Sequence, residues 1–323
     1  MEISPDVSAF TARYDAGAAQ LVSTTLVGDL ETPVSAFLKI AGRPNTFLFE
    51  SVEGGAVRGR YSIIGLDPDI IWRTNGTQAE INRNALNDPK AFQPCGAPPL
   101  EALRALVAES RLDVPHYLPP MAAGVFGYLG YDMVRLMEKL PAPNPDPLGN
   151  PDAILIRPTA IVIFDAVKDM IMVITPVRPE KNVTAKTAHA RAIERLSAVV
   201  DALEKPLPSQ EATPDFDPLK IATASNTAPA EYEEMVRKAK EYILAGDIFQ
   251  VVLSQRFEAP FPLPPFSLYR ALRRTNPAPY LYFLNFEGFS VVGSSPEILV
   301  TLRDRKVTVR AIAGTRPRGA TPH

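Results

Sequence analysis

The chain has 323 residues, 46% hydrophobic and 22% charged, so it can bury a large core and could hold two domains. Its formal net charge of -2 gives no general positive field for nucleic acid or an anionic membrane, and no apolar run has the length that crosses a bilayer. The single cysteine, Cys95, fits a reducing compartment, and the start lacks the basic-then-apolar order of a signal peptide, so the cytoplasm is expected.

The first part of the chain predicts short helices alternating with strands. Apolar spacing predicts helices over 7–14 and 32–40 and strands over 21–27, 46–51, 59–65 and 70–73. Thr32, directly before Pro33, is placed to accept hydrogen bonds from the free N–H groups that begin its helix. Asp67-Pro68 is expected to turn the chain between the last two strands.

The middle of the chain predicts two helices and a hairpin before a linker. The helices are expected over 99–109 and 185–204, and the hairpin pairs 159–164 with 170–175. The glycines of 122–132 are expected where backbones cross closely, because neither a Gly-x-Gly-x-x-Gly nor a Walker pattern is present. Residues 205–227 are polar, carry prolines and lack a period, as in a linker.

Beyond this linker, the pattern predicts a helix over 229–245 followed by a strand over 247–256. Glu231 lies in the first turn of the helix, where the dipole favours negative charge, and Gly246 is placed as its cap. Within the expected strand, Gln250 alternates with apolar residues, so it is either a satisfied polar core residue or a ligand contact.

The last stretch predicts a strand that ends in a loop suited to an anion. Residues 307–312 alternate apolar and polar, and Gly-Thr-Arg-Pro-Arg-Gly follows at 314–319. Gly314 allows close backbone approach, Thr315 adds a hydroxyl, and backbone N–H groups and guanidinium forks both bind carboxylates. An ordinary surface loop with scattered arginines explains the same residues.

Several segments, in this order and at this spacing, resemble the chorismate-utilising enzymes, and within that group the anthranilate synthase component I family. They are Leu48-Phe-Glu-Ser51, Gly59-Arg-Tyr-Ser-Ile-Ile-Gly65, Asn276-Pro-Ala-Pro-Tyr-Leu-Tyr-Phe283, Val292-Gly-Ser-Ser-Pro-Glu-Ile-Leu299 and Ile312-Ala-Gly-Thr-Arg-Pro-Arg-Gly319. The resemblance runs from about Phe47 to the last residue. It implies an α/β (α+β) fold with layered, mostly antiparallel large sheets and outer helices.

The resemblance also implies an activity. Ammonia, supplied from glutamine by a partner amidotransferase subunit (component II), would convert chorismate to anthranilate and pyruvate with Mg²⁺, as the first step of tryptophan biosynthesis. Gly314 and Thr315 would contact chorismate. Gln250 aligns with a lysine that activates water in isochorismate-forming relatives, and Ala313 with a lysine nucleophile of many aminodeoxychorismate synthases. An amide and a methyl group can do neither, which leaves ammonia as the attacking group.

A feedback site for L-tryptophan is implied as well. Its residues would be Leu48, Glu50, Ser51, Pro279, Tyr280 and Leu281, with Asn276. Phe49 should face away from Leu48 and Glu50 and affect packing only, whereas Arg60 and Ser62 share a strand face and could line the same pocket. The alternatives are that Ser51 caps a turn and that residues 276–283 form a packed edge strand.

We expect three parts along the chain. Residues 1–204 would form a regulatory, tryptophan-binding domain, 205–227 a linker, and 228–323 the start of a chorismate-binding catalytic domain that is incomplete, so that this chain alone is inactive. The family's metal ligands belong to segments after residue 323. The alternative functions are a non-catalytic tryptophan-binding module and aminodeoxychorismate synthase component I.

Overall fold

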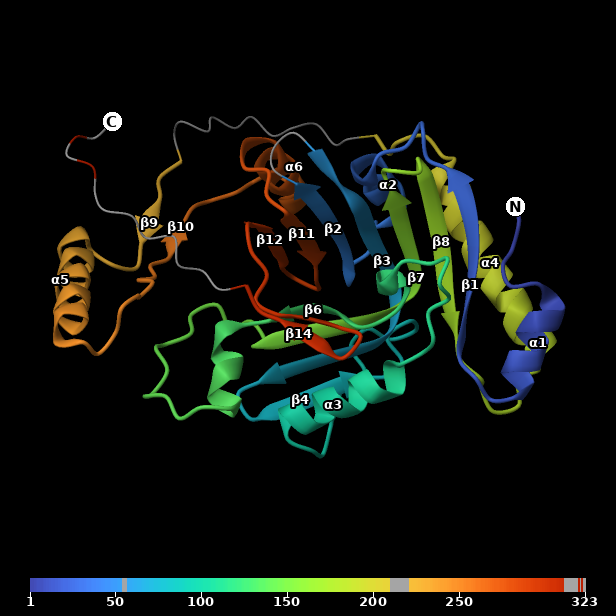
Figure 1. Cartoon of the computed structure of the whole chain (residues 1–323), viewed down its shortest axis with the longest axis horizontal. Helices are drawn as coiled ribbons and strands as arrows, with labels where there is room; N and C mark the ends of the chain where they lie inside the picture. Colours follow the sequence, from blue (N-terminus) through green and yellow to red (C-terminus); the bar gives the residue numbers. More distant parts are fainter. Residues whose placement is uncertain (54–56, 210–220, 311–318, 320, 322–323) are drawn as a thin grey trace. The chain divides into compact units, whose positions relative to one another are not determined.

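The computed structural model describes residues 1–53, 57–209 and 221–310, with 319 and 321, and most of its strands lie in one antiparallel sheet (Figure 1). The strands of this sheet run in the order β1-β8-β7-β3-β2-β11-β12, with β4 pairing β3, β5 pairing β4 and β6 pairing β7. Their bounds are β1 Gln20–Val27, β2 Thr46–Glu53, β3 Val57–Asn75, β4 Gln78–Asn82, β5 Gln93–Pro94, β6 Phe126–Leu129, β7 Ala153–Asp165, β8 Met170–Val177, β11 Tyr280–Asn285 and β12 Ser290–Ser295. The predicted class, large antiparallel sheets with helices outside, is confirmed.

The chain divides into two compact units, residues 1–208 with 268–323 and residues 209–267. The first unit holds the large sheet, the hairpin of β13 (Thr301–Arg303) and β14 (Lys306–Thr308), and the helices α1 (Val7–Asp15), α2 (Pro33–Ile40), α3 (Pro99–Ser110) and α4 (Ala185–Leu203). Residues 268–323 therefore fall in the same compact unit as residues 1–208. The functional domains predicted at 1–204 and 228–323 remain a prediction.

Helices cover the sheet where their apolar stripes face it. In α4 the side chains of Ala188, Ala192 and Leu196 are buried, and the helix packs against β8, α1 and α2. Thr184 caps its start by accepting a hydrogen bond from the Thr187 N–H. In α2 the expected cap is present, because Thr32 and Ser35 exchange backbone-to-side-chain hydrogen bonds.

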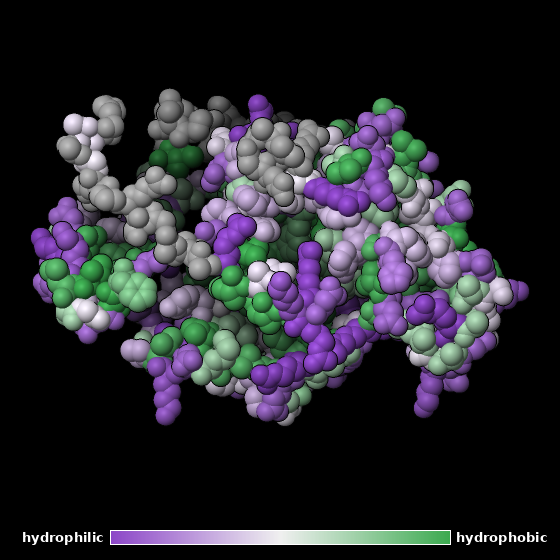
Figure 2. Space-filling model, viewed as in Figure 1, coloured by the Kyte–Doolittle hydropathy of each residue, from purple (hydrophilic) through white to green (hydrophobic). Residues whose placement is uncertain are grey.

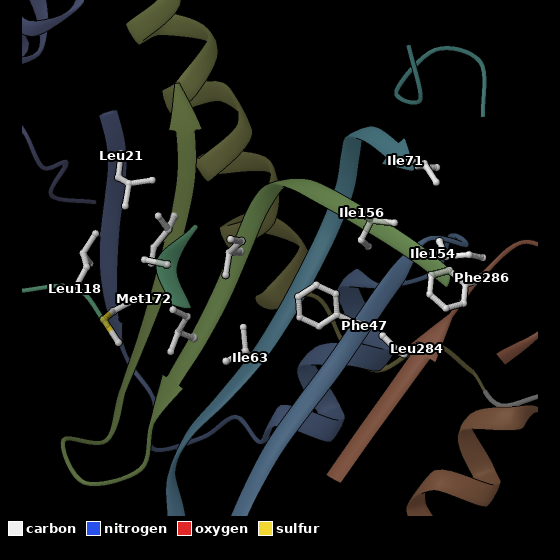
Figure 3. Close-up of a cluster of buried hydrophobic side chains, with 14 residues drawn as sticks. Leu21, Phe47, Ile63, Ile71, Leu118, Ile154, Ile156, Met172, Leu284 and Phe286 are labelled. Atoms are coloured by element: carbon white, nitrogen blue, oxygen red, sulfur yellow. The ribbon is translucent and has the colours of Figure 1, made fainter. Parts of the chain in front are cut away.

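Two apolar clusters fill the first unit. The larger one gathers Phe47, Ile63, Ile156, Met172 and Leu284 on one face of the large sheet (Figure 3). The other packs Trp72 of β3 against Ala102 and Leu106 of α3. Burial of these side chains, each worth about 1.5–3 kcal/mol for a large aliphatic group, holds the sheet that carries the site described below.

The predicted turn at Asp67-Pro68 is a bend within one strand. β3 runs from Val57 to Asn75, and its register against β7 shifts between Pro68 and Ile70. Asp67 has a φ of 46°, and its carbonyl accepts a hydrogen bond from the Thr159 hydroxyl at 2.7 Å. Since β7 pairs with both halves, the irregularity is absorbed as a bulge instead of reversing the chain.

The second unit contains α5 (Pro229–Ala245) and the short pair β9 (Ala224–Ser225) and β10 (Phe257–Glu258). The helix has the predicted bounds: the Glu231 carboxylate accepts a hydrogen bond from the Ala228 N–H, and Gly246 ends the helix with a φ of 82°.

The strand predicted over 247–256 is wrong, since residues 250–255 lie in neither helix nor strand. Alternation alone cannot form a strand without a neighbouring strand to complete its hydrogen bonds. The helix α6 (Pro265–Thr275) begins at the end of this unit, and its residues from Leu268 onward belong to the first unit.

Among the helices in the described part of the chain, none combines the length and the apolar character required to cross a membrane.

Candidate functional site

A cavity of about 820 Å³, which we call the large cavity, lies in the first unit against the face of the sheet that carries the larger apolar cluster. Most of its described lining residues come from β2, β3, β6, β11 and β12, with Arg303 of β13 and a few residues outside these strands. Six of the described lining residues are aromatic, namely Phe49, Tyr61, Tyr128, Tyr280, Tyr282 and Phe289. The space-filling view shows a hollow with hydrophobic residues at its floor and strongly hydrophilic residues beside it (Figure 2). Such a cavity suits a small molecule with a flat apolar body and a charged end.

Strand pairing brings the two predicted halves of the tryptophan site together. β2 and β11 are antiparallel neighbours, with Glu50 opposite Leu281 and Phe49 opposite Tyr282. Ser51 and Tyr280, more than two hundred positions apart in the sequence, therefore both line the large cavity. Residues of an early and a late strand meet here only because β11 inserts beside β2 in the sheet order.

The side chains of these strands do not face the cavity as the sequence predicted. Directly opposite residues share a sheet face, so Phe49 and Tyr282 lie on the cavity side, and Glu50 and Leu281 point to the other. Phe49 was expected to affect packing alone, yet it lines the cavity. Glu50 and Leu281 also border the cavity, but Leu281 is almost completely buried.

Leu48 shares the face opposite the cavity. It is fully buried and lies across from Phe283, whose ring packs edge-on against Phe37 of α2 at 5.5 Å between centroids. The predicted role of Leu48 as a direct contact in this cavity has no support from its position. The alternation of side chains along a strand could have identified Phe49 as a cavity residue, because it puts Phe49 on the same face as Ser51 and puts Leu48 with Glu50 on the other.

Glu50 is buried on that opposite face, where two residues of α6 hold its carboxylate. Its Oε2 accepts from the Tyr269 hydroxyl at 2.5 Å and from Arg273 Nε at 2.7 Å, and its Oε1 accepts from Arg273 Nη2 at 2.9 Å. Burial, with the nearby Glu50 charge, raises the pKa of Tyr269. Burial opposes the charge of Arg273, but the Glu50 contact prevails and raises its pKa. We call Glu50, Tyr269 and Arg273 the Glu50 cluster.

Two glycines create the space in which cavity side chains lie. A Cβ at Gly59 would overlap the Ser51 hydroxyl and come within 2.5 Å of the Ser51 carbonyl carbon. A Cβ at Gly293 would overlap the ring and hydroxyl of Tyr282, so the outer end of that ring lies over Gly293 of β12. A Cβ at Gly127 would overlap the Ile154 carbonyl oxygen, which confirms the close backbone crossing predicted for this segment.

Positively charged groups at the cavity come from Arg60 and Arg303 among its described lining residues. Arg60 donates from Nε and Nη2 to the carboxylate of Asp165, and this contact raises the pKa of Arg60. For Asp165, burial opposes ionisation, but hydrogen bonds from Arg60 and the Val167 N–H prevail and lower its pKa. Ser62, predicted beside Arg60, lines a separate cavity of about 110 Å³.

Tyr128 of β6 supplies a fixed polar end to the aromatic lining. Its hydroxyl donates to the carbonyl of Pro151 at 2.6 Å. Burial, with the charge of Asp152, raises the pKa of Tyr128 to about 12, so the phenol stays neutral across the physiological range. The resemblance had assigned this segment no ligand role.

The remaining predicted residues lie away from the large cavity or outside the described structure. Asn276 is exposed, and its carbonyl accepts from the Ser294 hydroxyl at 2.6 Å. Pro279 is half-buried just before β11, and neither residue is among the described ones that line this cavity. Gln250 is exposed in the second unit. Gly314, Thr315 and Ala313 lie outside the described residues.

The described residues contain no group of three or more His, Cys, Asp or Glu side chains that could hold a metal ion. The donor set in this part of the chain therefore does not fit Mg²⁺, which prefers several carboxylate and water oxygens around it.

A family model and several relatives match most of the chain. The model of the chorismate binding enzyme family matches residues 61–323. Anthranilate synthase component 1 of Cereibacter sphaeroides is 53% identical over 316 residues, which cover 97% of this chain and 63% of that protein. The same-named protein of Pseudomonas aeruginosa is 42% identical over 308 residues, covering 92% of this chain and 60% of that protein.

A solved structure shows the same relationship. The crystal structure of anthranilate synthase component I from Streptococcus pneumoniae matches with a TM-score of 0.63 at 28% identity, and the match covers 87% of this chain and 59% of that one. The chain thus spans between 60% and 63% of the length of the two curated relatives described above.

Proposed function

The chain belongs to the chorismate binding enzyme family, and we propose that it forms part of an anthranilate synthase component I. The whole protein would convert chorismate and ammonia to anthranilate and pyruvate, the first step of tryptophan biosynthesis. The observation that carries this proposal is the 53% identity over 97% of the chain to a protein of that name.

Tryptophan would bind in the large cavity and inhibit the enzyme. Phe49, Tyr128 and Tyr282 supply aromatic faces for an indole ring, and such pairs contribute about 0.5–1.5 kcal/mol beyond area burial. The Ser51 hydroxyl and the Arg60 guanidinium supply polar partners for the amino acid's charged groups. Since Arg60 also contacts Asp165, its role would be to share its charge between that residue and the ligand.

For the reaction itself, the proposal assigns chorismate to Gly314 and Thr315 through a backbone amide and a hydroxyl. Ammonia, delivered by a glutamine amidotransferase partner, would add to the ring as its hydroxyl leaves, and loss of pyruvate would then give the aromatic product. Gln250 cannot act as a general base for water and Ala313 cannot attack the ring. Mg²⁺, implied by the family, would supply Lewis-acid chemistry. The proposed location is the cytoplasm, which the single cysteine of the chain favours.

The experiment uses the full-length protein with chorismate, ammonia and Mg²⁺. We expect anthranilate fluorescence with release of pyruvate, and inhibition of both by tryptophan. A product that keeps its enolpyruvyl group would indicate aminodeoxychorismate synthase component I, and tryptophan binding without turnover would indicate a non-catalytic module.

Replacing Ser51 tests the regulatory assignment. Ser51→Ala should weaken tryptophan inhibition by about tenfold or more, since it removes a hydrogen bond to a charged ligand group. Turnover without tryptophan should stay near that of the unchanged enzyme. Ser8→Ala, on the exposed side of α1, is the matched control. Unchanged inhibition in Ser51→Ala would count against tryptophan in this cavity.

A further inference from the structure

The Glu50 cluster joins the wall of the large cavity to a helix. Glu50 is the β2 residue paired with Leu281 and directly precedes Ser51, so its backbone belongs to the wall where the predicted ligand would lie. Its side chain reaches the other face of the sheet and accepts three hydrogen bonds from Tyr269 and Arg273 of α6. The cavity wall and α6 are therefore tied through one carboxylate.

Breaking this tie is costly because its groups are buried together. The Glu50 side chain is 3% exposed and that of Arg273 29%, and Tyr269 is fully buried. Removing one partner from such a set leaves a buried charge or dipole without compensation. β2 and α6 must consequently move together while the contact lasts.

The same carboxylate borders a second, smaller space. Glu50 and Ser51 line both the large cavity and the cavity of about 110 Å³, and Arg273 lines the smaller one. Ser51 of the large cavity and Arg273 of α6 thus meet beside Glu50 at this smaller cavity.

A ligand that hydrogen-bonds Ser51 in the large cavity would act on the β2 backbone directly beside Glu50. A shift of that backbone would change the hydrogen bonds that the Glu50 carboxylate accepts from Arg273 and Tyr269 on the opposite face of the sheet, so α6 would be held differently when the cavity is occupied than when it is empty. A ligand shifts a conformational equilibrium only by the difference between its binding free energies for the two conformations. α6 is also the helix by which the chain enters the first unit from residues 209–267.

We propose that Tyr269 and Arg273 are positioning residues that transmit occupancy of the large cavity to α6 through Glu50. The proposal rests on the proposed function in taking tryptophan as the ligand and anthranilate formation as the activity. It adds that inhibition requires the Glu50 cluster, whereas binding does not.

The test separates binding from inhibition in the full-length enzyme. Tryptophan affinity is measured by calorimetry, and the activity that remains at saturating tryptophan is measured by anthranilate fluorescence. For Arg273→Gln we expect a tryptophan affinity within about threefold of that of the unchanged enzyme. The activity that remains at saturating tryptophan, which we call the plateau, should rise by about tenfold, within the usual range of allosteric coupling. Tyr269→Phe, which removes one hydroxyl and keeps the ring, should also raise the plateau.

Arg274→Gln is the matched control, because Arg274 is exposed on the same helix and should leave the plateau unchanged. Full inhibition at saturating tryptophan in both Arg273→Gln and Tyr269→Phe would overturn the proposal. Loss of tryptophan binding in both would also overturn it, since the cluster would then build the site instead of transmitting its state. Absence of tryptophan binding in the unchanged enzyme would overturn the proposed regulation itself along with this inference.

Discussion

Among single residues, the position of the Ser51 side chain depends on the missing side chain of its neighbour Gly59. Ser51 can turn its hydroxyl toward β3 because Gly59 has no side chain, and the backbone of Ser51 lies too close for one to be added. The sequence motif contains Gly59 but does not explain why a glycine is needed at this position. The structure gives a steric explanation, because a side chain at position 59 would overlap Ser51.

Gly59→Ala should both destabilise the protein and weaken tryptophan binding. The added methyl group meets backbone atoms of Ser51, which cannot rotate away, so β2 must shift at a cost of about 1–3 kcal/mol. Urea unfolding and calorimetry measure the two effects. Gly42→Ala is the control, because nothing lies within 4 Å of its added methyl group and it should change neither quantity. Wild-type stability in Gly59→Ala would contradict the steric argument.

At the scale of the element, the position of β11 between β2 and β12 forms the site. Its cavity face carries Tyr282 and its other face Leu281 and Phe283, so the ligand contacts and the packing core use alternate residues. β12 contributes through Gly293, over which the Tyr282 ring lies.

Gly293→Ala should therefore weaken ligand binding without a large loss of stability. Here the added methyl group meets the end of a side chain, and the Tyr282 ring can swing away from β12 into the cavity and reduce its volume. We expect tryptophan affinity to fall by about tenfold, and the free energy of unfolding to change by less than about 1.5 kcal/mol. Calorimetry and urea unfolding distinguish this variant from Gly59→Ala. Equal losses of stability in the two would show that the ring cannot move.

At the scale of the whole molecule, the cavity belongs to one compact unit formed by both ends of the chain. Its described lining residues lie in 1–208 and 268–323, and the large sheet supplies most of them. The proposed tryptophan site and the segment proposed to contact chorismate, which lies outside the described residues, can therefore be tested separately.

We predict that the 323-residue chain binds tryptophan but forms no anthranilate. In its described part, no cluster of acidic or histidine side chains fits Mg²⁺, whereas Phe49, Ser51 and Tyr282 already line the large cavity. Calorimetry with tryptophan and a fluorescence assay with chorismate, ammonia and Mg²⁺ test both halves. Detectable magnesium-dependent turnover by this chain would show that the active site has been misplaced.

Local pattern and motif determined much of this protein from the sequence alone. The helices α1 to α5, the strands β1, β2 and β8 and the second half of β7 follow from apolar periodicity, caps and glycines, which act over a few residues. The antiparallel sheet class was implied by the family resemblance. The pairing of an early with a late segment around Ser51 and Tyr280 was a prediction from resemblance, and both residues line one cavity.

Only the tertiary structure decided which strands are neighbours and which faces they present. It joined two predicted strands into β3, left residues 250–255 without a strand, and turned Phe49 instead of Leu48 toward the cavity. A strand needs a partner, and a buried carboxylate such as Glu50 needs donors; both come from segments far away in the sequence. Periodicity within a short window contains no information about those distant partners.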